Sequence, residues 1–230
     1  MILYPTNALV EDQVTRLRKA CSTAMLNAGH PPFFFGRYTG ATIGSQAIPK
    51  KHSEGRVKTV KRDLQAIENE QATLGTDDVE VVSQFSDLHS GEMLTRWDMM
   101  SAPPDILVTN SSMLNVMLMR DLEEPIFEST RQWIQKRSDH CFTLVVDELH
   151  SYRGTQGSEV ALVIRSLLRR LGLSPDSPQL RCIGTSASLD GHEGLSYLEQ
   201  FFGADQKTFK ILPGNERQVK AKRTISKEEA

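Results

Sequence analysis

The stretch Cys141–Gly154, CFTLVVDELHSYRG, decides the fold of this chain. It begins with the apolar run Phe142–Val146, and a short run without polar alternation predicts a strand buried on both faces, as in a parallel sheet. Ligands of such sheets bind outside the carboxyl ends of the strands. Asp147 and Glu148 follow at that end, where one carboxylate can hold Mg²⁺ and the other can orient or deprotonate water. An ordinary strand followed by an acidic loop is the alternative that these residues alone leave open.

The length, composition and net charge of the chain are those of an ordinary globular protein. The 230 residues, 39% hydrophobic and 24% charged, suit one large α/β domain or two small ones. A formal net charge of -2 neither predicts nor excludes a nucleic-acid partner. The scattered Cys21, Cys141 and Cys182 argue against a disulfide framework or a zinc site and are typical of a reducing cytosol, so we expect a cytoplasmic protein. No apolar run reaches the roughly 18 residues of a membrane span, and Met1–Tyr4 is too short for a signal peptide.

Predicted strands alternate with predicted helices along most of the chain. Strands are expected at residues 2–4, 33–35, 79–85, 105–110, 142–146 and 180–184. Helices are expected at residues 10–28, 91–97, 111–118, 125–134, 155–171 and 195–202. Such alternation predicts an α/β fold with parallel strands and right-handed crossovers.

The pattern is weaker in residues 45–80, which we interpret as an insertion. This segment carries a basic cluster without interleaved aromatic residues: Lys50, Lys51, Arg56, Lys58, Lys61 and Arg62. A solvated surface is the default interpretation of such a charge run, and contact with nucleic acid is the alternative. Residues 204–230 turn polar and basic and are expected to be a linker or tail.

Five predicted strand ends carry polar residues. They are Pro5-Thr6-Asn7, Arg37-Tyr38-Thr39-Gly40, Thr109-Asn110, Asp147-Glu148-Leu149-His150 and Ser186-Ala187-Ser188. In a parallel sheet with right-handed crossovers, the carboxyl ends of the strands lie on one edge. The sequence therefore predicts a composite site along that edge.

These strand ends resemble the motifs of superfamily 2 DExH/DEAD-box helicases. Asp147–His150 (DELH) is similar to motif II, and Ser186–Ser188 (SAS) is similar to motif III. Residues 4–9 with Gln13 resemble motif Ia, and the short motifs at residues 38–40 and 109–110 resemble those that follow it. The strings PPDILVTNSSML and DELHSYRGTQGSEVALVIRSLLRRL look closest to the YprA/MrfA-like, Lhr-related DNA helicases. The resemblance covers about residues 2–203.

The resemblance implies a fold and a set of roles. Residues 1–203 would be a partial RecA-like ATP-binding domain: an α/β three-layer sandwich with a mostly parallel sheet, incomplete at its N-terminus. Asp147 would hold the Mg²⁺ of MgATP, Glu148 would polarise the attacking water, and His150 with Ser186, Ala187 and Ser188 would couple the nucleotide state to strand movement. The residues expected to line the nucleic-acid backbone, DNA rather than RNA, are Pro5, Thr6, Asn7, Arg37, Thr39, Gly40, Thr109 and Asn110. Hydroxyl and amide groups bind phosphates without reading bases, which suits a translocase.

The sequence departs from the family in two respects, since it lacks both the Walker A loop and the second RecA-like domain. It contains no G-x-x-x-x-G-K-[ST] loop to cradle the phosphates, and the nearest glycine-rich stretch, Gly40–Ser45, lacks the lysine. In the family this Walker A loop precedes motif Ia, and a second RecA-like domain with an arginine finger follows. We therefore expect a fragment or one half of a split helicase. Its partners would be nucleic acid and the missing parts, in cis or as a separate chain, and the chain alone would have little or no ATPase activity.

Two alternatives remain at this point. The chain could be a catalytically inactive RecA-like module that binds nucleic acid or a partner protein. It could also belong to a different class of P-loop NTPase that uses Asp147 and Glu148.

Overall fold

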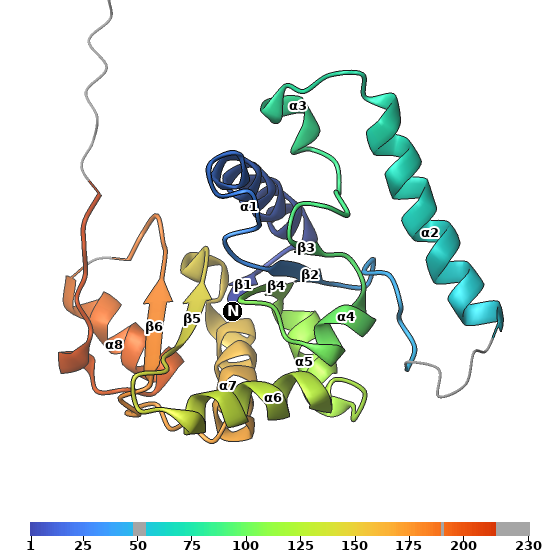
Figure 1. Ribbon diagram of the computed structural model, residues 1–230. Helices are drawn as coiled ribbons and strands as arrows, with labels where there is room; N and C mark the ends of the chain where they lie inside the picture. Colours follow the sequence, from blue (N-terminus) through green and yellow to red (C-terminus); the bar gives the residue numbers. More distant parts are fainter. Residues whose placement is uncertain (48–53, 190, 215–230) are drawn as a thin grey trace, which may run out of the picture.

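The structure, a computed structural model, describes residues 1–47, 54–189 and 191–214 (Figure 1). Lys50, Lys51 and most of the predicted tail lie outside the described residues. Six strands form one sheet in the order β3-β2-β4-β1-β5-β6, and every pairing is parallel. The strands are β1 (Ile2–Tyr4), β2 (Phe35–Tyr38), β3 (Glu92–Met93), β4 (Ile106–Asn110), β5 (Phe142–Val146) and β6 (Leu180–Gly184). The predicted α/β class with a parallel sheet is confirmed.

Helices connect the strands. They are α1 (Asn7–Ala28), α2 (Glu54–Thr73), α3 (Val79–Val82), α4 (Arg96–Ser101), α5 (Ser111–Met119), α6 (Glu124–Lys136), α7 (Gly154–Arg170) and α8 (Gly191–Phe202), with short 3-10 turns η1 (Leu149–Ser151) and η2 (Gln206–Thr208). α1 begins where the Thr6 hydroxyl accepts a hydrogen bond from Leu9 N at 3.5 Å. It ends at Gly29, whose φ of 72° only glycine adopts readily and whose N–H donates to Met25 O at 2.8 Å.

The sheet separates two hydrophobic cores because successive side chains of a strand point to opposite faces. Leu3 and Leu107 belong to the larger core, which α4–α8 complete, whereas Tyr4 and Val108 belong to a smaller core under α1. Figure 1 shows α1 on one side of β1, β2 and β4, with α5, α6 and α7 on the other. These strands therefore lie in a three-layer sandwich.

The β5–β6 half of the sheet is covered on one face only. Leu144 and Val146 of β5 are fully buried in the larger core, but Val145, on the opposite face, is only half-buried. On the edge strand β6, Ile183 is 43% exposed. The prediction that residues 142–146 are buried on both faces is therefore wrong for one face, because among the described residues no helix packs over it.

Three predicted elements are wrong or displaced, and hydrogen bonds that the sequence pattern does not reveal account for two of them. The strand expected at residues 33–35 starts instead at Phe35, whose N–H donates to Gly91 O at 3.1 Å, and it runs on to Tyr38. The strand expected at 79–85 is replaced by the single-turn helix α3, since the Asp78 carboxylate caps it by accepting from Glu80 N at 2.9 Å. The helix expected at 91–97 begins only at Arg96, after strand β3.

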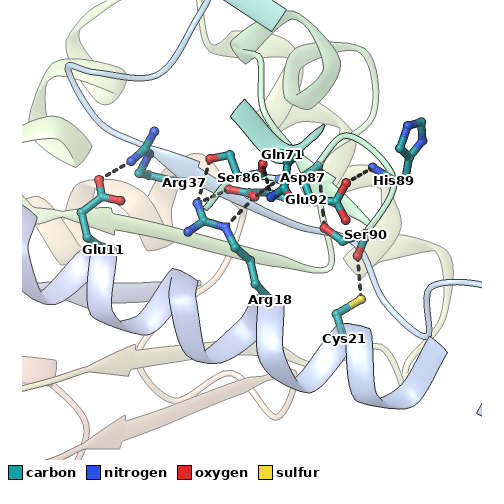
Figure 2. A network of polar contacts seen from close by, with 10 residues as sticks. All are labelled: Glu11, Arg18, Cys21, Arg37, Gln71, Ser86, Asp87, His89, Ser90 and Glu92. Carbon is teal, nitrogen blue, oxygen red and sulfur yellow. Dashed lines mark hydrogen bonds and ion pairs between the residues drawn. The ribbon is translucent and has the colours of Figure 1, made fainter. Parts of the chain in front are cut away.

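A buried ion pair fastens α1 to the sheet edge (Figure 2). Arg18 of α1 donates from Nε to Glu92 Oε2 at 2.7 Å and from Nη2 to Glu92 Oε1 at 2.8 Å, and the two side chains are only 5% and 2% exposed. Arg18 also donates to the Ser86 hydroxyl at 2.9 Å, and Glu92 accepts from Asp87 N at 3.4 Å. The loop before β3 is thereby held against α1.

Replacing one member of this pair is expected to be costly because it leaves the other charge buried and unpaired. Arg18→Met should lower the free energy of unfolding by about 3–5 kcal/mol, and the double variant Arg18→Met/Glu92→Leu should recover much of that loss. Arg16, two residues away, pairs with Asp12 in an exposed contact, so Arg16→Met should change stability by less than about 1 kcal/mol. Urea unfolding measures all three, and equal losses for Arg18→Met and Arg16→Met would contradict the assignment.

Candidate functional site

The carboxyl ends of the parallel strands form one edge of the sheet. The register places Tyr4 beside Asn110 and places Val146 beside both Leu3 and Gly184. The polar residues that end β2, β4, β1, β5 and β6 therefore follow one another along this edge. The prediction that these strand ends share an edge is confirmed.

The order along the edge differs from the order in the chain. β1 comes first in sequence but lies between β4 and β5. As a result, the residues predicted to contact nucleic acid gather on β2, β4 and β1. The DELH and SAS segments lie side by side after β5 and β6.

Thr185 joins the DELH and SAS segments. Its hydroxyl donates to Asp147 Oδ1 and accepts from Glu148 N at 3.3 Å, and its carbonyl oxygen accepts from Leu149 N at 2.8 Å. Thr185 is not among the predicted site residues, although its place directly before Ser186 at a strand end is a signal for it. Thr185, the residue that follows β6, thus fixes the position of the Asp147 carboxylate.

Glu148 has a strained backbone. Its φ of 54° is left-handed, a conformation that no other non-glycine residue adopts within the described ranges and that costs about 1–2 kcal/mol for an L-residue. Its Oε2 lies 3.1 Å from His150 Nδ1, an ion pair when the imidazole is protonated, although that nitrogen makes no hydrogen bond. The contacts from Thr185 on either side of Glu148 hold this turn in place.

Close packing of the Leu149 side chain behind the turn favours glycine at the end of β6. A Cβ atom on Gly184 would lie 2.2 Å from Cδ1 of Leu149, which is completely buried. A second, exposed hydrogen bond joins the residues that follow DELH to the SAS segment: Arg153 donates to the Ser188 hydroxyl at 3.0 Å. The two strand exits are therefore joined both in the core and at the surface.

Tyr4, at the end of β1, lies within the electrostatic field of this site. Burial and then the nearby Asp147 carboxylate raise the pKa of Tyr4 to about 12. Its hydroxyl donates to Gln13 Oε1 at 3.0 Å. Tyr4 is therefore a neutral hydrogen-bonding group at physiological pH rather than an acid.

The other half of the edge is built from helix caps. Asn110 Nδ2 donates to Asn7 Oδ1 at 2.6 Å, which links the exits of β4 and β1. Asn110 also caps α5 by accepting from Met113 N at 2.7 Å, so the last residue of β4 begins the helix expected at residues 111–118. Thr6 and Asn7 are exposed, whereas Pro5 is half-buried.

Some predicted contact residues point inward. The buried Thr109 hydroxyl donates to Tyr38 O at 2.6 Å, and the carbonyl oxygen of buried Thr39 accepts from Arg96 Nη2 at 2.6 Å. Arg37 lies within β2, not after it, and pairs with Glu11 of α1. Of the predicted group, Thr6, Asn7 and Gly40 are the exposed members, and Asn110 is half-buried.

The DELH end fits part of a magnesium–nucleotide site. Mg²⁺ is commonly held by one or two protein carboxylates together with water and substrate phosphates, and Asp147 supplies one carboxylate at a strand end. Within the described residues no group of three or more His, Cys, Asp or Glu side chains is arranged to hold a metal. The sequence supplies no Walker A loop for the phosphates.

Comparison with known proteins gives two relatives. Over its whole length, in an alignment of 277 residues, the chain is 30% identical to the Druantia protein DruE of Escherichia coli (strain UMEA 4076-1), of which it covers 15%. Across 45% of its length it is 31% identical to the ATP-dependent helicase HRQ1 of Saccharomyces cerevisiae, of which it covers 8%. The chain is a helicase-related domain. It spans only a small part of either curated relative.

Two solved structures of the DUF1998 helicase MrfA are weakly similar. The DNA-bound structure has a TM-score of 0.37 and 19% identity, covering 82% of this chain and 26% of that one. The structure with DNA and AMPPNP has a TM-score of 0.35 and 17% identity over the same shares. Overlays with such scores add no argument for function. No family model matches the chain. No helix in the described part is long and apolar enough to cross a membrane.

Substituting Gly184 tests the packing behind the DELH turn. Gly184→Ala should force Leu149 aside and destabilise the chain by about 1–3 kcal/mol. The matched control is Gly55→Ala in the first turn of α2, where a Cβ meets nothing within 4 Å, so the stability should change by less than about 1 kcal/mol. Urea unfolding distinguishes the two, and a Gly184→Ala variant as stable as the unmodified chain would show that Leu149 does not pack there.

Proposed function

We propose that the chain is part of the ATP-binding domain of a DNA helicase or translocase. One observation carries the proposal: the DELH and SAS segments are joined by Thr185, and the polar ends of β1, β4 and β2 follow them along the same edge of the sheet. The similarity to the ATP-dependent helicase HRQ1 supports it.

In this proposal each strand exit has a role. Asp147 would hold the Mg²⁺ of MgATP, which neutralises phosphate charge when bound, and Glu148 would orient the attacking water. Thr185 would keep the Asp147 carboxylate in place. His150 and Ser186–Ser188 would pass the nucleotide state on, and the Arg153–Ser188 bridge gives that step a physical link.

The nucleic-acid strand would run along the β1, β4 and β2 exits. Thr6, Asn7 and Gly40 are exposed there, and hydroxyl, amide and glycine backbone groups contact phosphates without reading the bases. Thr39 and Thr109 would shape this path from beneath, since both are buried. DNA, rather than RNA, is the proposed substrate.

The phosphate-binding loop would come from another segment, in cis or as a separate chain. The open edge of β6 and the uncovered face of β5–β6 support this proposal, because a further parallel strand with its helix would cover Ile183 and Val145. The carboxyl end of that strand would lie at the same edge as Asp147. A catalytically inactive module that binds nucleic acid or a partner is the second candidate, because the polar strand ends along one edge can contact a nucleic-acid backbone without any turnover.

The proposal predicts where ATP turnover appears. The isolated chain should hydrolyse ATP no faster than background, whereas the full-length protein that contains it should turn over ATP. In that protein Glu148→Gln should lower the rate by about 10²–10⁴-fold and spare nucleotide binding, because only water activation is lost. Glu159→Gln, an exposed carboxylate on α7, is the control. Retained turnover in Glu148→Gln would remove Glu148 from its role, and a full-length protein without turnover would favour the inactive module.

The strand path predicts a separate effect on DNA binding. Asn7→Ala should weaken binding of a labelled oligonucleotide by the chain roughly three- to tenfold for every sequence tested, since one phosphate hydrogen bond is removed. Asn115→Ala, exposed on α5, should bind like the unmodified chain. Fluorescence polarisation measures both. A weakening that depends on base sequence would contradict backbone recognition.

A further inference from the structure

An arginine fastens the turn that follows β2. Arg96, the first residue of α4, is only 3% exposed. Its Nη2 donates to Thr39 O at 2.6 Å, and its backbone N–H donates to Ile43 O at 2.9 Å. Arg96 therefore holds both ends of the turn Thr39–Ile43. Within this turn lies Gly40, an exposed residue of the path proposed for the nucleic-acid strand.

The bond from Arg96 to Thr39 sets the direction of the Gly40 N–H. The Thr39 carbonyl and the Gly40 N–H belong to one peptide group, and no peptide bond within the described residues is cis. In a trans peptide the C=O and N–H bonds point in opposite directions. Because Arg96 holds the oxygen on the buried side, the N–H of exposed Gly40 points away from the guanidinium. This N–H donates to no other described residue.

The chain itself does not need a glycine at position 40. A Cβ atom there would meet no described atom within 4 Å, and the backbone does not adopt a positive φ. Glycine does, however, let a ligand come close to the backbone, because no side chain covers the N–H. Gly40 therefore suits a phosphate that approaches its N–H directly.

The Arg96 guanidinium carries a buried positive charge that forms no ion pair with another described residue. Its Nε makes no hydrogen bond, and its Cζ lies 4.9 Å from the centre of the Tyr38 ring. Glu123, which accepts from the Tyr38 hydroxyl at 2.8 Å, pairs with Arg120 instead. A buried cation without a carboxylate partner makes the electrostatic potential around it positive, which favours an anion at the Gly40 N–H.

We propose that Arg96 is the positioning residue for a phosphate contact at Gly40. Through Thr39 O it aims the Gly40 N–H at a backbone phosphate of the strand, and its buried charge strengthens that hydrogen bond from beneath. Arg96 touches no phosphate itself. The inference rests on the proposed function, because that function places a nucleic-acid strand along this edge. It gives a role to Thr39, which is buried although it was expected to contact the nucleic acid directly.

The test separates the charge of Arg96 from its part in folding. Arg96→Met removes the charge and the bond to Thr39, and Arg96→Lys keeps the charge; Arg96→Gln replaces Arg96→Met if the latter does not fold. The matched control is Arg18→Met/Glu92→Leu, which removes another buried arginine together with its carboxylate partner. Binding of labelled oligo(dT) of about 20 nucleotides to the chain is measured over a range of salt concentrations. Urea unfolding shows whether each variant is folded.

Loss of the Arg96 charge should change both the affinity and its dependence on salt. Arg96→Met should bind roughly tenfold more weakly at low salt, and its slope of log K against log salt should be shallower by about 0.7, because one phosphate is no longer neutralised. Arg96→Lys should recover the slope and most of the affinity. The control should bind like the unmodified chain. A purely structural loss would leave the slope unchanged.

A second variant, Gly40→Ala, tests whether Arg96 acts through Gly40. Its Cβ meets no described atom within 4 Å, so it should fold whether or not Arg96→Met does. The methyl group should hold the phosphate away from the N–H and weaken binding roughly three- to tenfold. If both residues serve one contact, Arg96→Met should weaken the Gly40→Ala chain by less than about twofold further, because contributions to a shared interaction do not add.

Three results would overturn the inference: unchanged binding by Gly40→Ala, equal weakening by Arg96→Met and the control, or losses at Arg96 and Gly40 that add. If Asn7→Ala weakens binding while the Arg96 and Gly40 variants do not, the inference fails alone. If the unmodified chain binds no oligonucleotide, the inference falls together with the nucleic-acid part of the proposed function.

Discussion

The parallel pairing of β1 with β4 on one side and β5 on the other is the constraint on which the rest of the structure depends. β1 has only three residues, yet Leu3 pairs with Thr109 and with Val146 and is completely buried. This short strand aligns the exits of its neighbours and divides the two cores. Without β1, nothing would align the DELH segment with the Asn110 cap along the edge, because β5 and β4 pair with β1 and not with each other.

The chemistry of the edge depends on a second, more local constraint. Glu148 occupies a left-handed conformation that an L-residue adopts only when its surroundings impose it. The surroundings here are Thr185, which bonds on both sides of Glu148, and Gly184, which leaves room for Leu149. The residues after β6 hold the strained turn that carries the Glu148 carboxylate. A shift of the residues after one of these two strands would therefore displace those after the other. This property fits the coupling role proposed for the SAS segment.

The sequence predicted best where burial patterns were long and worst where short hydrogen-bonded caps decided the structure. The apolar stripes of α1, α7 and α8 and the runs of β4 and β5 were predictable because each buries an apolar face in a core, whereas β6 contributes only the partly buried Leu180 and Cys182. Alternation at Val79, Val81 and Phe85 indicated a strand, but the Asp78 cap closes a helical turn there. Arg37 and Thr109 were expected to face nucleic acid, yet they are held by Glu11 and by Tyr38 O, partners distant in sequence that no local pattern reveals.

The sequence by itself determined the α/β class and the polar ending of five strands, because these follow from residue type and local periodicity, and it carries the resemblance of the DELH and SAS segments to helicase motifs. Only the tertiary structure decided that β1 lies between β4 and β5, which separates the DELH end of the edge from the half proposed for the nucleic-acid strand. It also decided that Thr185 holds Asp147 and that Arg96 holds the carbonyl oxygen of Thr39. The physical reason is that strand order and contacts between distant residues depend on how complete faces of the sheet and helices pack together. The residues that make up those faces are spread over the whole chain, so no single segment specifies the outcome.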